Sequence, residues 1–348
     1  MEAIKPILAI TMGDPAGIGP EIIIKSLSQE DTYAKCRPIV CGDASVMRWT
    51  AQALNPEIKI NAVKDVSEAL FQYGTIDVYD LECIDINDFK IGEEAPQCGN
   101  AAFVSIRKAI ELAMENKVDG TVTAPLNKKA LNMAGHHFDG HTEIYAHFTG
   151  TKKYAMLLAE ETFRVIHVST HVSLREACDR VKKDRIMEVT ELIADACRQF
   201  GIEKPRIGIA GLNPHASDNG LFGWEEEKEI SPAVEELKSK GFDVDGPVPP
   251  DTVFAKARSG KYDGCVAMYH DQGHIPFKVI GFNWNKETGR MESAQGVNIT
   301  LGLPIIRVSV DHGTAFDVAG KGIASHKGML LAIDYATKMA ITRIKDRT

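Results

Sequence analysis

Short apolar runs alternate with amphipathic stretches along most of the chain. The apolar runs predict strands, each followed by a loop, at residues 6–11, 118–124, 154–159, 164–169, 206–210 and 264–268. Apolar residues at helical intervals predict helices at residues 101–116, 185–200 and 225–240, and another from about residue 20. Strands that alternate with helices in this way are typical of an α/β fold with a largely parallel sheet.

Three later segments complete the pattern. Residues 275–282 (IPFKVIGF) and 301–310 (LGLPIIRVSV) are largely apolar and predict two further strands. Residues 283–295 (NWNKETGRMESAQ) form the most polar stretch and predict an exposed surface loop. No Pro/Ser-rich linker marks a boundary, so two domains would have to be interleaved along the chain.

Composition narrows the class of protein without identifying it. The 348 residues suffice for two domains, and a net charge of -8 argues against a nucleic-acid partner. No apolar run approaches the roughly 20 residues that span a bilayer, and no secretion signal is visible at the start. The seven cysteines are scattered without a CxxC pair, as expected of reduced thiols in the cytoplasm.

Three of the predicted strands lead into a histidine. The strand from Arg164 is followed by His171, that from Arg206 by His215 and that from Gly264 by His270. Ligands of parallel α/β sheets bind beyond the carboxyl ends of the strands, where three imidazoles could hold one metal with a position open for substrate. A single histidine in this place more often binds a loop carbonyl, and the wide spacing forms no local zinc motif. Both interpretations remain open from the spacing alone.

Several other catalytic motifs are missing. The sequence has no HExxH, GxSxG or Walker motif, which argues against the hydrolases and P-loop nucleoside triphosphatases that use them. Residues 13–20 (GDPAGIGP) are glycine-rich but fit neither GxGxxG nor GxxxxGK. This segment is either a turn shaped for packing or a ligand loop, and a nucleotide would not be held in the Rossmann manner.

Longer motifs resemble known enzymes. Residues 312–324 (HGTAFDVAGKGIA) resemble the adenosine-binding loop of isopropylmalate and isocitrate dehydrogenases. Seven blocks resemble, in the same order, the 4-hydroxythreonine-4-phosphate dehydrogenase family. They are ITMGDPAGIGPEI, TAPLNK, GHTE, GLNPHA, PPDTVF, AMYHDQGHIPFK and GVNITLGLPIIR. The chain is therefore identified as a member of this family.

The resemblance implies a fold and a division into domains. The implied fold is a two-domain α/β/α unit like that of isopropylmalate and isocitrate dehydrogenases, with the active site in the interdomain cleft. We expect residues 1–132 with 302–348 to form the first domain. Residues 133–301 would form the second, with the dimer interface and the metal ligands.

The resemblance also implies the site residues. His171, His215 and His270 would be the catalytic metal ligands, with His171 reaching a metal held mainly by the other subunit of a homodimer. Substrate contacts would come from His141, Thr142, Lys278, Asn298 and Arg307, and cofactor contacts from His312, Gly313, Thr314 and Asp317. Lys278 and Arg307 can supply the positive charge that a phosphorylated carboxylic acid needs.

The expected reaction is an oxidation followed by decarboxylation. A divalent metal would lower the pKa of the substrate hydroxyl, and NAD would accept the hydride. Three imidazoles favour zinc, cobalt or nickel, while magnesium and manganese remain alternatives for the family. The carboxylate of Asp317 would accept hydrogen bonds from the adenosine ribose and repel an added phosphate, which favours NAD over NADP.

Two branches of the family differ in substrate. One oxidises 4-phosphohydroxy-L-threonine in pyridoxal phosphate synthesis, and the other oxidises 4-phospho-D-threonate or 4-phospho-D-erythronate. TAPLNK and the THxxLR pattern at residues 170–175 resemble the second branch. The long polar run at residues 283–295 departs from the family and bears on the placement of Lys278. A non-catalytic metabolite-binding protein and a metallohydrolase are the alternatives from other classes.

Overall fold

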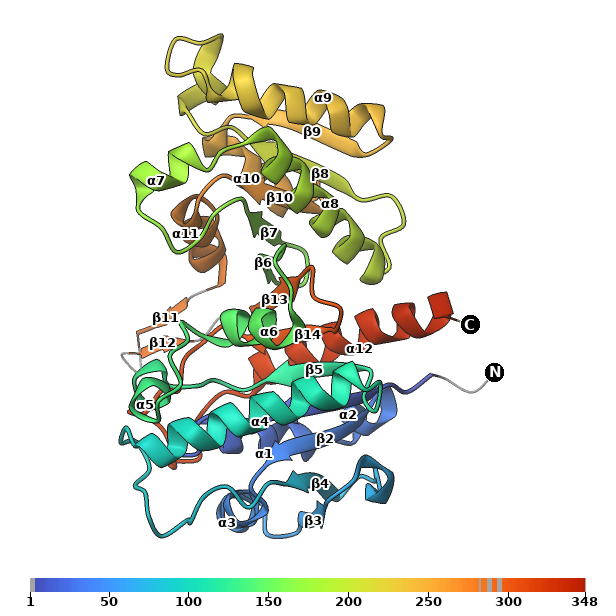
Figure 1. Ribbon diagram of the computed structural model, residues 1–348, viewed down its shortest axis with the longest axis vertical. Coiled ribbons are helices and arrows are strands. Elements are labelled where there is room, and N and C mark those ends of the chain that lie inside the picture. The colour runs from blue at the N-terminus through green and yellow to red at the C-terminus, as the bar shows by residue number, and fades with distance from the viewer. Residues whose placement is uncertain (1–3, 282, 287–289, 293–295, 348) are drawn as a thin grey trace. The chain divides into compact units, whose positions relative to one another are not determined.

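The computed structural model describes residues 4–281, 283–286, 290–292 and 296–347 (Figure 1). The chain divides into two compact units, Met1–Lys152 with Leu303–Thr348, and Lys153–Gly302. The two units are therefore interleaved along the sequence. Residues 133–152, which the sequence analysis assigned to the second domain, make their contacts within the first unit.

Parallel strands form the sheet of the first unit. Their order is β3-β4-β2-β1-β5-β14, and each neighbouring pair is parallel. The strands are β1 (Ile7–Thr11), β2 (Arg37–Gly42), β3 (Lys59–Val63), β4 (Thr75–Asp80), β5 (Gly120–Thr123) and β14 (Arg307–Val310). The inner strands are almost wholly buried because helices cover both faces of the sheet.

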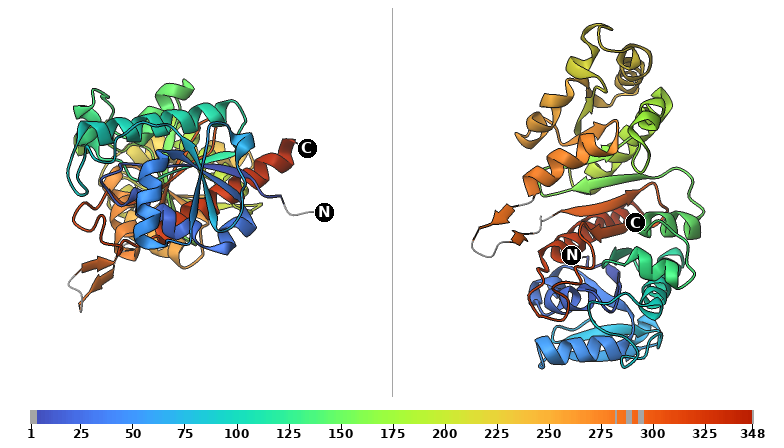
Figure 2. Two further views of the ribbon diagram at one scale, coloured as in Figure 1. Left: turned by 90° about the horizontal axis from the view of Figure 1, so that it is seen from below. Right: turned by 90° about the vertical axis from the view of Figure 1, so that its left-hand side faces the viewer.

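Two layers of helices enclose this sheet (Figures 1 and 2). One layer contains α4 (Pro96–Met114), on which α5 (Lys128–Met133) and α6 (His141–Thr149) both pack. The other contains α1 (Gly19–Leu27), α2 (Glu30–Lys35), α3 (Ala44–Leu54) and α12 (Lys327–Arg347). A short 3₁₀ helix (Val66–Glu68) precedes β4. The apolar face of α4 joins β1 and β2 in a buried core cluster that includes Ile39, Phe103 and Ile106.

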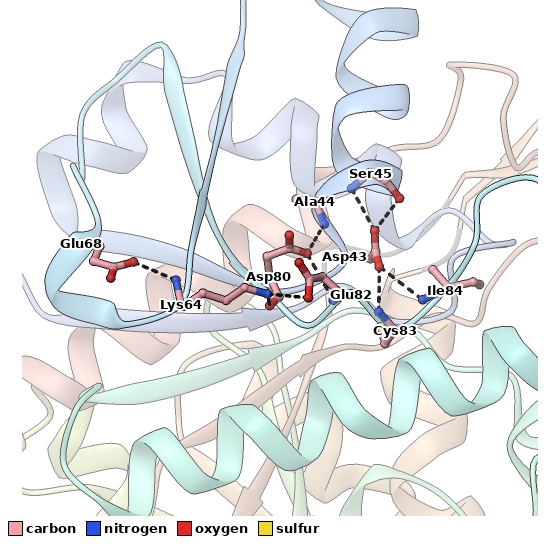
Figure 3. Close-up of polar contacts among 9 residues, drawn as sticks. All are labelled: Asp43, Ala44, Ser45, Lys64, Glu68, Asp80, Glu82, Cys83 and Ile84. Atoms are coloured by element: carbon pink, nitrogen blue, oxygen red, sulfur yellow. Dashed lines mark hydrogen bonds and ion pairs between the residues drawn. The ribbon is translucent and has the colours of Figure 1, made fainter.

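Carboxylates at the ends of two strands determine where α3 begins (Figure 3). Asp43 accepts hydrogen bonds from the backbone N–H groups of Ser45 and Cys83, each at 2.9 Å. Asp80, the last residue of β4, accepts from the backbone N–H of Ala44 at 3.0 Å. The first turn of a helix has N–H groups without helical acceptors, and these oxygens satisfy them. Both carboxylates therefore have a structural role.

The glycine-rich turn after β1 brings backbone segments unusually close. Gly13 has a φ of +74°, and a Cβ there would lie 2.5 Å from the carbonyl oxygen of Pro125. A Cβ at Gly17 would lie 2.9 Å from the Cβ of Thr314. The structure thus shows the packing role of this turn, one of the two interpretations of its sequence.

The second unit has a mixed sheet in the order β13-β6-β7-β10-β8-β9. Its strands are β6 (Ala155–Ala159), β7 (Arg164–His167), β8 (Arg206–Ala210), β9 (Asp243–Val248), β10 (Gly264–Ala267) and β13 (Val297–Leu301). β7, β10, β8 and β9 run parallel, whereas β6 is antiparallel to both of its neighbours. The parallel half of this sheet carries the candidate metal ligands.

Helices flank the second sheet as well. α8 (Lys183–Gln199) packs with α9 (Ser231–Ser239), and α10 (Pro250–Arg258) packs with α11 (His270–Gly281). α7 (Leu174–Asp179), a 3₁₀ segment (Pro214–Asp218) and a π-helical turn (Glu226–Ile230) lie in the connections. A second core cluster, which includes Phe163, Phe254 and Phe277, fills the space between α10, α11 and the sheet.

The predicted α/β fold is confirmed, but three segment predictions need correction. The strand predicted at residues 301–310 is observed only at Arg307–Val310, because Leu301 ends β13 and residues 302–306 connect the two strands. Residues 275–281 are not a strand; they belong to α11, where Phe277 is buried while Ile275 and Val279 are exposed. Phe282 lies outside the described residues. The predicted surface loop at 283–295 contains a small antiparallel hairpin, β11 (Asn283–Asn285) and β12 (Arg290–Glu292). Residues 287–289 and 293–295 lie outside the described part.

Two other predictions concern the whole chain. All seven cysteines are free. Within the described part of the chain, no helix is both long and apolar enough to cross a membrane. A cytoplasmic location stays a prediction.

The turn after β1 gives a stability prediction. A Gly13→Ala substitution adds a Cβ at positive φ and forces it onto the Pro125 carbonyl. We expect a loss of about 1 kcal/mol in unfolding free energy from the backbone conformation and ~1–3 kcal/mol more from the overlap. Gly74→Ala is the matched control, because Gly74 has a φ of +86° with nothing within 4 Å of the added Cβ. Equal losses in urea unfolding of the two variants would contradict the argument.

Candidate active site

Three neighbouring strands bring the predicted metal ligands to one edge of the second sheet. β10 pairs in parallel with β7 on one side and with β8 on the other. His171 follows β7, His215 follows β8 and His270 follows β10. Parallel strands end at the same edge, so the three loops share the side at which such sheets bind ligands.

His171 and His270 lie close together. Their ring centroids are 5.8 Å apart, and both residues line a pocket of about 430 Å³ together with Thr170, Tyr269 and Asp271. The Nδ1 of His270 is 2.6 Å from an Asp271 carboxylate oxygen, to which it can donate a proton. This contact favours the tautomer whose Nε2 carries a free lone pair, as a metal ligand requires.

His215 lies in a strained connection. Its φ is 56°, and residues 215–219 all have positive φ values. The segment before it is anchored by the buried Glu226, which accepts from the backbone N–H groups of Leu212 and Asn213, each at 2.7 Å. The His215 ring lies 6.3 Å from that of Phe222. Backbone strain of this kind concentrates at functional sites.

The structure does not gather all three predicted ligands in one chain. Among the residues that the structure describes, no three His, Cys, Asp or Glu side chains are placed to hold one metal ion. The contacts bring together His171 and His270 but not His215. The donor chemistry of imidazoles at the carboxyl edge nevertheless suits a divalent transition metal.

α11 adds a histidine that the sequence analysis missed. His270, His274 and Lys278 are spaced by four residues and therefore lie along one face of the helix. The rings of His270 and His274 stack at a centroid distance of 3.6 Å and an angle of 11°. The four-residue spacing is meaningful only in a helix, and the sequence analysis predicts a strand at residues 275–282, so it does not single out His274.

His167 lies behind this stack. It is 1% exposed, and its ring centroid is 4.7 Å from that of His274. Burial, followed by the charge of His274, lowers the pKa of His167 to about 3. Burial, followed by the charge of His270, lowers the pKa of His274 to about 4. Both rings are therefore neutral near pH 7.

The predicted substrate residues divide between the two units. Lys278 is half-buried on α11, and Asn298 is half-buried on β13 opposite Leu158, so both belong to the second unit. His141, Thr142 and Arg307 belong to the first unit.

Arg307 is a buried cation in the first unit. It is 3% exposed, and one terminal nitrogen donates to the hydroxyl of Thr123, the last residue of β5, at 3.0 Å. Its guanidinium carbon lies 5.8 Å from the centre of the Tyr145 ring. Burial lowers the pKa of Arg307 to about 10, so that the group stays charged near pH 7.

His141 lies in the electrostatic field of this cation. It begins α6, and its Nε2 is buried without a hydrogen-bond partner among the described residues. Burial, followed by the charge of Arg307, holds the pKa of His141 well below its usual range, so the ring is neutral. Thr142 follows in the first turn of α6 and is half-buried. A fixed cation beside a neutral imidazole with an unpaired nitrogen is suited to bind an anionic, hydroxylated molecule.

The predicted cofactor residues follow β14. His312, Thr314 and Asp317 lie in a loop in which Asp317 is exposed and the space beside Gly313 is open. An exposed carboxylate and an unobstructed backbone fit a nucleotide ribose. The buried Asp14 lies in the neighbouring turn, and burial raises its pKa to about 6.

Comparison with known proteins identifies the family. The family model described as pyridoxal phosphate biosynthetic protein PdxA matches residues 34–336. The chain is 46% identical over 339 residues to the D-threonate 4-phosphate dehydrogenase of Cupriavidus necator, with 97% of this chain and 98% of that protein covered. It is 47% identical over 334 residues to the D-threonate 4-phosphate dehydrogenase of Pectobacterium atrosepticum, covering 96% and 99% of the two.

Solved structures agree with this result. The crystal structure of 4-hydroxythreonine-4-phosphate dehydrogenase from Klebsiella pneumoniae matches with a TM-score of 0.83 and 45% identity. The match covers 97% of this chain and all of that one. These relatives are named dehydrogenases, so the chain is an oxidoreductase, and its family implies a nicotinamide-type cofactor and a divalent metal. The chain belongs to the pyridoxal phosphate biosynthetic protein PdxA family.

Proposed function

We propose that the protein oxidises the C3 hydroxyl of 4-phospho-D-threonate and then decarboxylates the product to a phosphorylated ketone. The observation that carries this proposal is the buried, charged guanidinium of Arg307 beside the neutral His141. A guanidinium fixed in place by burial can bind an oxyanion bidentately, and a phosphorylated acid supplies such a group. Two relatives named for D-threonate 4-phosphate, at 46% and 47% identity, select the substrate within this class.

Each side chain has a separate role in the proposed reaction. Arg307 binds one anionic group of the substrate, because its planar guanidinium can donate two parallel hydrogen bonds to an oxyanion. Lys278 and Asn298 supply a second charge and a neutral donor, and Thr142 supplies a hydroxyl. His141 stays neutral, so its unpaired Nε2 can exchange a hydrogen bond with a substrate hydroxyl. A bound divalent metal would acidify the C3 hydroxyl, and NAD would accept the hydride.

Metal and cofactor choice follow from ligand chemistry. His171, His215 and His270 would hold the metal, and imidazole ligands favour zinc, with cobalt, magnesium and manganese as alternatives. His312, Gly313, Thr314 and Asp317 would contact the dinucleotide. The exposed Asp317 carboxylate favours NAD, because it would repel the extra phosphate of NADP.

We also propose a homodimer that shares its active sites. The second unit exposes apolar side chains near the candidate site, among them Leu174 beside the His171 pocket and Ile275 and Val279 on α11. Exposed apolar groups of this kind are typical of protein interfaces. In this arrangement His171 completes a site that the partner subunit's His215 and His270 begin. Within one chain the His171 and His270 rings lie 5.8 Å apart, but no third ligand joins them among the described residues.

A second candidate substrate is 4-phosphohydroxy-L-threonine. Solved relatives at 45% identity are named for 4-hydroxythreonine-4-phosphate. The two substrates differ at the carbon beside the carboxylate, which carries either a hydroxyl or an amino group. Rates of NADH formation with each substrate separate the two activities and also test whether the protein is a non-catalytic binding protein.

The substrate proposal predicts a ranking. With zinc and NAD, we expect kcat/KM for 4-phospho-D-threonate to exceed that for 4-phosphohydroxy-L-threonine by at least about tenfold, with 4-phospho-D-erythronate between them. NADH absorbance under identical conditions measures all three, and NADP should give the lower efficiency. A higher efficiency with the amino acid would transfer the proposal to the other branch. No turnover with any of the three would support a binding protein.

The buried cation predicts a loss of substrate binding. Arg307→Met should lower kcat/KM by about 10- to 100-fold, because a charge-assisted contact is lost. Arg307→Lys keeps the charge without the planar fork and should recover only part of this loss. Arg343→Met is the control: Arg343 is half-buried on α12 and donates to the Pro304 carbonyl at 3.0 Å. Equal effects at both positions would show a loss of folding rather than of substrate binding.

The shared site predicts complementation between inactive variants. His171→Ala and His270→Ala should each be inactive, and mixing them with subunit exchange should restore activity. About half of the reassorted dimers are mixed and each has one complete site, so recovery should approach roughly a quarter of the wild-type rate. Confirmed exchange without recovery would place the three histidines in one chain.

A further inference from the structure

Polar side chains of α1 hold the segment at the end of the candidate cofactor loop. Glu21 and Lys25 are spaced by one helical turn on α1, and Gln29 follows two residues beyond its end. All three bond to the segment between Gly322 and His326. This segment directly continues the loop that carries Asp317.

Lys25 makes the densest set of contacts. Its Nζ donates to Glu21 Oε1 at 2.7 Å, to the Gly322 carbonyl at 3.0 Å and to the Ala324 carbonyl at 2.7 Å. An ammonium group has three N–H donors, so every donor of Lys25 is used. The Lys25 side chain is 22% exposed, which makes the contact set more than a surface ion pair.

Glu21 closes the arrangement from the other side. Its Oε1 also accepts from the backbone N–H of Ala324 at 2.7 Å, and its side chain is 4% exposed. Gln29 adds a third contact, at 2.7 Å between its Nε2 and His326 Nε2. Removing one member of a buried ion pair leaves the other without compensation, so the pair and the segment depend on each other.

The other end of the loop is tied to the same part of the chain. The backbone N–H of Ile18, which precedes α1, donates to the Thr314 carbonyl at 3.0 Å. Gly17 lies so close to Thr314 that a Cβ would not fit between them. The loop between Thr314 and Ala324 is thus fixed at both ends to α1 and the turn before it, while Asp317 at its centre stays exposed.

We propose that Glu21 and Lys25 are positioning residues for the nucleotide cofactor. They hold the loop in the conformation that presents Asp317, which lowers the ordering cost that binding must overcome. The inference rests on the proposed role of this loop in cofactor binding. Neither residue needs to touch the cofactor for the effect to occur.

The test compares an α1 variant with a matched ion pair elsewhere. Lys25→Met should raise the Kd for NAD, measured by calorimetry, about tenfold, which is the cost of roughly one charge-assisted hydrogen bond. The KM for 4-phospho-D-threonate should change by less than about twofold, because binding of the acid does not depend on this loop. Lys25→Arg keeps the donors and should restore most of the affinity. Lys35→Met is the control, since Lys35 pairs with Asp334 at 3.1 Å and is 54% exposed.

Hydrogen exchange supplies a readout that does not need turnover. In the protein without NAD, amides of residues 314–324 should exchange faster in Lys25→Met than in the wild type, above all the Ala324 amide that Glu21 holds. If Lys25→Met does not fold, Glu21→Gln serves instead, because it keeps an acceptor for Ala324 and loses only the charge. Unchanged NAD affinity and exchange in a folded variant would overturn the inference.

The same experiment separates this inference from the proposed function. If NAD binds the wild type without protecting residues 312–324, the cofactor role of the loop is wrong. If NAD protects this loop in the wild type but binds Lys25→Met equally well, the loop binds the cofactor and only the positioning role of α1 is wrong.

Discussion

The parallel pairing of β10 with β7 and β8 is the constraint on which the candidate metal site depends. Backbone hydrogen bonds fix the register of these strands, and the loops that follow them must leave the sheet at one edge. This pairing brings the loops that carry His171, His215 and His270 to one edge of the sheet, although successive members of the three are 44 and 55 positions apart along the chain. Each loop then determines how its histidine is presented. The buried Glu226 anchors the segment before His215, and α11 begins at His270 itself.

Burial of charge organises the first unit in a similar way. A buried charge is stable only where geometry supplies partners, so each such group restricts the backbone around it. Arg307 is the first residue of β14, and its side chain reaches the end of β5. There it donates a hydrogen bond to Thr123 and lies over the Tyr145 ring. Burial of His141, followed by the positive charge of Arg307, lowers the pKa of that imidazole and keeps it neutral. Glu21 and Lys25 restrict a loop in the same way. All three N–H donors of Lys25 are used in the observed conformation, so another conformation of the loop would break these hydrogen bonds.

The histidines of the second unit include candidate metal ligands and residues that pack behind them. His270 has one ring nitrogen against Asp271, and its face stacks on His274. His274 in turn packs near the buried His167, and burial keeps both of these rings uncharged. The uncharged rings of His167 and His274 do not repel a divalent cation, so they are compatible with a metal at the neighbouring edge. The orientation of His270 is therefore determined by packing as well as by the hydrogen bond to Asp271.

The fold class and most of the elements could be predicted from the sequence, because alternation of apolar and polar residues is a local property of the chain. The family was predicted from the resemblance of seven sequence blocks. The sequence predicted β8 at residues 206–210 and placed the strands before His171 and His270 within about two residues of their observed ends. It misread residues 275–281, because an apolar composition does not distinguish a strand from a helix that buries one side. That error concealed the spacing of His270, His274 and Lys278. Contacts between residues far apart in the sequence depend on the tertiary structure, among them the contact between Arg307 and Thr123 and the hydrogen bonds between α1 and residues 322–326. Such contacts join segments up to 303 residues apart, as between Glu21 and Ala324, and their geometry depends on how strands and helices pack.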